Sequence, residues 1–298
     1  VFVTNLRQPE MKRYRLSYAD LDKVNHRIVY ASVNGYGKHG RDKDLPSYDT
    51  TTYWSRSGIP QAFSVPGVPV MGYRPAFGDN VAGLALAFGV MTALYVREKT
   101  GVGQEIDTSL MHIGMYQISF DINGALATGL DFADWRESPP EATVTKAQLA
   151  NMEVGQFYAA KATNPLSAAY ITKDTRRIFF LSLQPDRYWK KFCLAIGRED
   201  LANDPQYETT KGRAEHNAAL RKTIGETFIT KTQAEWIPLL EGLPYAPAQS
   251  VKEATMDQQV RHNGFVISYD HPTYGHLESL ANPVNMSKTP AEYRLPAP

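Results

Sequence analysis

The chain has 298 residues, and 32 Lys and Arg residues nearly balance 31 Asp and Glu residues, which gives a formal net charge of +1. This balance excludes a nucleic-acid binder that works by neutralising phosphates, and an apolar fraction of 43% excludes a disordered chain. The single cysteine, Cys193, excludes a disulfide scaffold and a cysteine-rich zinc site and favours a reducing, cytoplasmic compartment.

The first part of the chain is typical of an α/β fold. Residues 1–6 and 27–34 are rich in Val, Ile and Tyr and predict two short strands. Between them, Ser17 and Asp20 have the spacing of a capping box, which predicts a short helix. The order strand, helix, strand predicts a parallel sheet. We expect another helix over residues 47–58.

Residues 80–96 form an uncharged stretch of 17 residues. A membrane span needs about 20 apolar residues, and this stretch also contains Gly83 and Gly89. We therefore expect a helix buried against the sheet and no membrane partner. A strand over residues 104–108 and a helix from Ser109 follow.

The character of the chain changes at residues 134–145, which are polar and contain Pro139 and Pro140. We predict a domain boundary there, with a large α/β domain over residues 1–135 and a smaller α+β domain over residues 136–248. In the second part, we expect a hairpin over residues 168–183 and then helices over residues 186–196, 214–230 and 233–241, the last with Thr232 as its N-cap.

One carboxylate stands out as a candidate catalytic group. Asp79 follows Gly78 and directly precedes the long apolar helix. One interpretation is an ordinary helix N-cap. The other is a nucleophile beside backbone N–H groups that stabilise an oxyanion. Tyr48 and Asp49 stand at the start of the preceding predicted helix, where their pattern alone is typical of a helix cap with a packed tyrosine.

Other polar groups give weaker signals. Four basic residues follow the first strand, and they indicate either a solvated surface or a phosphate site at the carboxyl edge of the sheet: Arg7, Lys12, Arg13 and Arg15. The seven histidines show no metal-ligand spacing, so we expect no metal site.

In order along the chain, these motifs resemble the class III CoA-transferases, the family of formyl-CoA transferase and carnitine CoA-transferase. The resemblance covers nearly the whole chain and is nearest to the branch that acts on 2-hydroxyacyl-CoA esters. It implies a Rossmann-like large domain that binds CoA, and an interlocked homodimer. The matching stretches are residues 1–7, 16–21, 27–37, 48–49, 78–83, 100–104, 107–110, 164–166, 170–174 and 204–205.

The resemblance also implies site residues. Asp79 falls on the family's catalytic aspartate, which forms a covalent anhydride and then a CoA thioester, and Tyr48 and Asp49 fall beside it. CoA enters as the acyl-CoA substrate, with a small carboxylic acid as second substrate, and no permanently bound cofactor is implied. The positions that contact CoA are Asn5, Leu6, Arg13 and Tyr14.

A loop near the acyl site corresponds to Asn164, Pro165, Leu166 and Ser167. Formyl-CoA transferase has a run of glycines there, so this chain does not support a glycine lid. Against the family, Val1 falls after the first βα units and Pro298 before the terminal helix, and residues 249–298 return to the large domain. We expect that these residues alone do not complete an active site.

Two alternatives stay open at this point. The family contains α-methylacyl-CoA racemases, which use a histidine where this chain has Tyr48. An ordinary tyrosine has a pKa near 10 and is a poor base at neutral pH, which favours transfer over racemisation. The second alternative is a CoA-ester binding protein without catalysis.

Overall fold

The computed structural model describes residues 1–63, 73–129 and 164–293, and the chain divides into two compact units. Unit 1 spans Val1–Gln156 and unit 2 spans Phe157–Pro298. The boundary that we predict near residue 135 falls outside the described residues. The three-part domain division, with its return segment, therefore stays a prediction.

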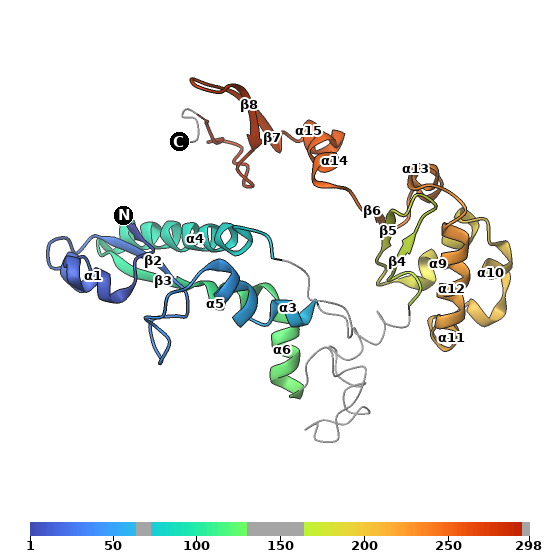
Figure 1. Cartoon of the computed structure of the whole chain (residues 1–298), viewed down its shortest axis with the longest axis horizontal. Helices are drawn as coiled ribbons and strands as arrows, with labels where there is room; N and C mark the ends of the chain where they lie inside the picture. The colour runs from blue at the N-terminus through green and yellow to red at the C-terminus, as the bar shows by residue number, and fades with distance from the viewer. Residues whose placement is uncertain (64–72, 130–163, 294–298) are drawn as a thin grey trace. The chain divides into compact units, whose positions relative to one another are not determined.

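A three-stranded parallel sheet organises unit 1, as the sequence predicts (Figure 1). The strand order is β1-β2-β3, and Tyr30 on the middle strand pairs with Phe2 and Glu105 on its neighbours. The middle strand is the most buried because it has a neighbour on each side. The strands are β1 (Phe2–Thr4), β2 (Val29–Asn34) and β3 (Gln104–Ser109).

Short helices connect these strands. The predicted capping box is confirmed: the Ser17 hydroxyl accepts a hydrogen bond from the Asp20 N–H at 3.3 Å. The sequence analysis missed α1, which begins at Gln8 with proline in its first turn. The helices of unit 1 are α1 (Gln8–Tyr14), α2 (Tyr18–Asp22), the π-helix η1 (Thr50–Arg56), α3 (Ile59–Ala62), α4 (Phe77–Thr100), α5 (Leu110–Gln117) and α6 (Ser119–Thr128).

Helix α4 packs against β2 and β3 with one side only. The side facing the sheet carries small residues, and Gly89 lies against Ile106 of β3. The sequence analysis predicts that the whole helix is buried, and this is wrong for the side that faces away from the sheet. Four large apolar residues are exposed there: Leu84, Phe88, Met91 and Tyr95. By length and composition alone, α4 also qualifies as a candidate membrane span, with 17% of its apolar window buried.

Unit 2 is built around an antiparallel sheet of order β4-β5-β6, with helices packed on it. The predicted hairpin is confirmed as β4 and β5. The predicted helix over residues 214–230 is two helices that break at His216. The elements are β4 (Ala169–Ile171), β5 (Arg177–Phe180), α9 (Pro185–Ala195), α10 (Glu199–Asn203), η3 (Pro205–Tyr207), α11 (Thr210–Glu215), α12 (Asn217–Phe228), α13 (Gln233–Trp236), η4 (Ile237–Leu240) and β6 (Tyr245–Pro247).

The core of unit 2 is aromatic. Phe228 is fully buried, stacks on Tyr170 with ring centroids 5.1 Å apart, and lies 4.9 Å from the ring of Trp236. Cys193 is fully buried in the same cluster, and burial raises the pKa of its thiol to about 12. This cysteine is therefore a packing residue and not a nucleophile.

Beyond this core, the chain forms two short helices and an antiparallel hairpin. Asp270 and His276 lie opposite each other in the hairpin, 3.1 Å apart. The elements are α14 (Val251–Met256), α15 (Gln258–His262), β7 (Val266–His271) and β8 (Gly275–Leu280). Taken together, the chain is a mixed α/β protein with a parallel sheet and many helices.

Candidate active site

A cavity of about 430 Å³ lies at the carboxyl ends of the parallel strands in unit 1. Ligands of open α/β sheets bind at this edge. Segments that follow β1 and β2 form one wall, and the first turns of α4 and α5 form another. The lining residues are Asn5, Arg7, Val33, Asn34, Gly35, Lys43, Leu45, Ser47, Tyr48, Asp49, Asp79, Ala82, Gly83, Leu86 and Leu110.

Asp79 lies in the first turn of α4, exposed and on the cavity wall. It is not the N-cap, because the helix begins at Phe77 and Ala76 occupies the cap position. Ala76 has a φ of +61°, a left-handed conformation that costs a non-glycine residue about 1 kcal/mol. The capping interpretation of Asp79 is therefore wrong, and its carboxylate is free to face the cavity.

Asp49 caps the helix in its place. Both of its carboxylate oxygens lie 3.1 Å from the N–H of Gly78, a residue 29 positions further along the chain. The first N–H groups of a helix have no partner within the helix. A buried carboxylate at this end satisfies one of them and also interacts favourably with the helix dipole. Asp49 thereby fixes the start of α4, and with it the position of Asp79.

The backbone N–H groups of this turn are occupied. Those of Phe77 and Asn80 donate to the carbonyls of Arg74 and Ala76, and that of Gly78 donates to Asp49. The expected oxyanion site at these groups is therefore not open in this structure.

Burial raises the pKa of Asp49, and the like charge of Asp79 raises it further, while the Gly78 N–H opposes the shift. A buried carboxylate beside another carboxylate favours its protonated form. A carboxyl group with a raised pKa contributes stability that is present below its unfolded pKa and is lost as the pH rises through its folded pKa.

We expect Asp49→Asn to become more stable relative to the wild-type protein as the pH rises from 4 to 8, because the amide keeps an oxygen for Gly78 and removes the buried charge. Asp49→Ala instead leaves the Gly78 N–H without its partner and should lose about 1–3 kcal/mol at neutral pH. Urea unfolding of the three proteins at several pH values measures both effects. Equal pH dependence of the wild-type and Asn proteins would contradict this assignment.

Tyr48 precedes Asp49 and also lines the cavity, with 75% of its surface exposed. Its backbone is held by Thr51: the Tyr48 N–H donates to the Thr51 hydroxyl at 3.0 Å, and the Tyr48 carbonyl accepts from the Thr51 N–H. The structure therefore brings Tyr48, Asp49 and Asp79 to one cavity, as the sequence analysis expects.

The four expected CoA-contacting residues, unlike Tyr48, Asp49 and Asp79, do not all line this cavity. Asn5 lines the cavity, and Leu6 follows it in the segment after β1. Arg13 and Tyr14 lie in the last turn of α1 and are absent from the cavity wall, and the Arg13 guanidinium lies over the Tyr14 ring at 5.8 Å. The structure thus brings only Asn5 of this set to the cavity that holds Asp79, and all four roles stay predictions.

Arg7 belongs to the basic cluster for which one interpretation is a phosphate site at the carboxyl edge of the sheet, and the structure places Arg7 in the cavity at that edge. The sequence analysis missed Lys43, which is one of several charges in residues 38–46. Within the described parts of the chain, no group of three His, Cys, Asp or Glu residues is arranged to hold a metal ion.

Comparison with known proteins decides the family. A family model described as CoA-transferase family III matches residues 1–298. The chain belongs to this family. It is 30% identical to (R)-2-hydroxy-4-methylpentanoate CoA-transferase of Clostridioides difficile, over 100% of this chain and 69% of that protein. It is 28% identical to cinnamoyl-CoA:phenyllactate CoA-transferase of Clostridium sporogenes, over 92% of this chain and 62% of that protein.

Solved structures agree on the fold of this CoA-transferase family III chain. The orthorhombic crystal structure of Rv3272 from M. tuberculosis matches 98% of this chain and 71% of that one, with a TM-score of 0.75 and 21% identity. A CAIB/BAIF family protein from Brucella suis matches 97% and 69%, with a TM-score of 0.72 and 21% identity. At these identities the likeness shows the fold alone.

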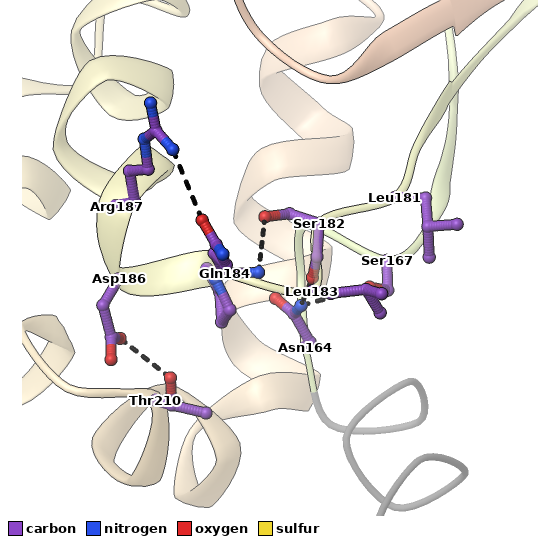
Figure 2. Close-up of a pocket in the computed structure, with 10 residues that line it drawn as sticks. Asn164, Ser167, Leu181, Ser182, Leu183, Gln184, Asp186, Arg187 and Thr210 are labelled. Carbon is purple, nitrogen blue, oxygen red and sulfur yellow. Dashed lines mark hydrogen bonds between the residues drawn. The ribbon is translucent and has the colours of Figure 1, made fainter.

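The expected substrate loop lies in unit 2 of this family III chain, and its side chains are used internally (Figure 2). The Asn164 amide donates to the Ser182 carbonyl at 2.9 Å and to the Ser167 hydroxyl at 3.1 Å, and its oxygen accepts from the Leu166 N–H. The buried Tyr170 hydroxyl donates to the Pro165 carbonyl at 2.7 Å. The polar groups of the loop are therefore paired within unit 2, and Leu166 belongs to the core.

Two residues of the loop, Asn164 and Ser167, also line a cavity of about 530 Å³ in unit 2. Figure 2 shows Leu181, Arg187 and Thr210 around the same cavity. The substrate role of the loop stays a prediction.

Proposed function

We propose that the complete protein to which these residues belong catalyses CoA transfer from an acyl-CoA thioester to a carboxylic acid, with Asp79 as the nucleophile and a 2-hydroxy acid as acceptor. The observation that carries the proposal is the exposed Asp79 on a cavity at the carboxyl edge of the sheet. The names of two relatives, which act on 2-hydroxy-4-methylpentanoate and phenyllactate, support the acceptor class.

The proposed reaction proceeds in four balanced steps. The Asp79 carboxylate attacks the thioester carbonyl, the C–S bond breaks, and CoA leaves as thiolate, which gives a mixed anhydride. The thiolate then attacks the aspartyl carbonyl and releases the donor acid. The acceptor carboxylate next attacks the aspartyl thioester and releases the CoA thiolate, which gives a second mixed anhydride. The thiolate finally attacks the acceptor's carbonyl in this anhydride, which forms the new acyl-CoA and regenerates the Asp79 carboxylate. Each covalent state keeps the acyl activation of the thioester.

Asp49 contributes positioning in this scheme, because its bond to Gly78 fixes the turn that carries Asp79. Tyr48 lines the same cavity and stands where the family's racemases use a histidine, which favours transfer over racemisation. The interlocked homodimer, the CoA contacts and the cytoplasmic location belong to the same proposal.

A panel of acyl-CoA donors and carboxylic acids tests this function. We expect the complete wild-type protein to form a new acyl-CoA only when both substrates are present, with 2-hydroxy acids as the best acceptors. Uptake of solvent deuterium at the α-carbon without an acceptor acid would favour the racemase instead. Binding of acyl-CoA without either reaction would favour the non-catalytic alternative.

A further inference from the structure

Two carboxyl groups line the cavity, Asp49 and Asp79. Under the proposed function, the acid that accepts CoA enters this cavity as a carboxylate and attacks the thioester on Asp79. Removing a carboxylate from water costs free energy unless its charge is paired. A cation on the cavity wall supplies such a partner and holds the acid beside Asp79.

Among the residues that the structure describes, two basic side chains line the cavity, Arg7 and Lys43, and Arg7 already has partners. Its guanidinium lies 2.9 Å from the carboxylate of Glu10 and also donates to the carbonyl of Asp44 at 3.5 Å. Lys43 has no ion pair or hydrogen bond with any residue that the structure describes. Its ammonium group is therefore available for a ligand.

The loop that carries Lys43 is anchored by ion pairs before this residue and by a turn that spans it. Lys38 pairs with Glu105 at 2.6 Å, and Asp42 pairs with Arg56 at 2.8 Å. The Leu45 N–H donates to the Asp42 carbonyl at 3.0 Å. These contacts use the neighbouring charges to hold the loop and leave the Lys43 side chain to the cavity.

We propose that the Lys43 ammonium binds the carboxylate of the acid that accepts CoA and holds it beside Asp79. The inference rests on the proposed function and names the group that recognises its second substrate. A compact, flexibly attached charge suits a carboxylate that must move between solvent and the aspartyl thioester.

Steady-state kinetics of Lys43→Met in the full chain test the inference. We expect KM for the acid to rise about tenfold or more, while kcat and KM for acyl-CoA stay within about twofold. Lys43→Arg should restore most of the affinity for the acid. Lys23→Met is the matched control, since it removes the same charge from an exposed residue outside the cavity.

Calorimetric titration with (R)-2-hydroxy-4-methylpentanoate gives a second readout that needs no catalysis. We expect Lys43→Met to bind this acid about tenfold more weakly than the wild-type chain. Equal dissociation constants, or no binding to either protein, would overturn the role of Lys43. A rise in KM for acyl-CoA alone would overturn it too, since Lys43 would then bind the phosphates of CoA. A wild-type chain that binds the acid and transfers no CoA would instead refute the proposed function.

Discussion

Asp79→Asn should abolish CoA transfer, with kcat lower by about 10⁴-fold or more, in a protein that keeps its fold. Asparagine has nearly the shape of aspartate, and Asp79 is exposed, so little packing is lost. An amide has no negative charge with which to attack a thioester. Neither the anhydride nor the aspartyl thioester can form, and every later step depends on them. Measured kcat values report the loss of catalysis, and urea unfolding shows whether the variant keeps the stability of the wild-type fold.

Trapping identifies the residue directly. After incubation with acyl-CoA, hydroxylamine should convert Asp79 of the wild-type chain to a hydroxamate that mass spectrometry detects, and the variant should stay unmodified. Asp22→Asn, on α2 and outside the cavity, is the matched control and should react like the wild-type chain. Asp79→Ala excludes slow deamidation of the asparagine. An adduct at another carboxylate would remove Asp79 from the mechanism.

Features that depend on a few neighbouring residues can be predicted from this sequence. The capping box of Ser17 and Asp20 is confirmed, and the predicted N-cap at Thr232 is confirmed by its bonds with Glu235. Both signals lie within four residues of chain. The parallel sheet is predictable for a similar reason, because β1 and β2 show apolar runs, β3 shows a strand-like alternation, and the order of elements indicates the topology.

Features that depend on distant contacts are not predictable in this way. The cap of α4 comes from Asp49, which no local pattern near Phe77 indicates. The fully buried Arg213 has the sequence context of a solvated charge, yet it packs over Trp189 and donates to the carbonyl of Tyr207. Likewise, no local signal distinguishes Lys43 from the paired charges of its loop. Tertiary structure decides these roles.

Gly78→Ala should destabilise unit 1 and sharply reduce CoA transfer. A Cβ atom at this position would overlap the Asp49 carboxylate and the ring of Tyr53, which is fully buried. Gly78 lies inside a helix, where alanine is the better residue by about 1 kcal/mol, so any loss of stability must come from this overlap. Overpacking of a filled site costs about 1–3 kcal/mol. Because Asp49 holds the turn that carries Asp79, relief of the overlap should displace Asp79, the proposed nucleophile.

Gly83 in the same helix provides the matched comparison for stability. A Cβ atom there meets nothing within 4 Å, so Gly83→Ala should raise the free energy of unfolding by about 0.5–1 kcal/mol. The same chemical change thus has opposite signs at two positions of α4, five residues apart in sequence. Urea unfolding of both variants measures this difference. A stabilised Gly78→Ala protein with full activity would show that Asp49 does not fix the start of α4, and the positioning role assigned to it would fail.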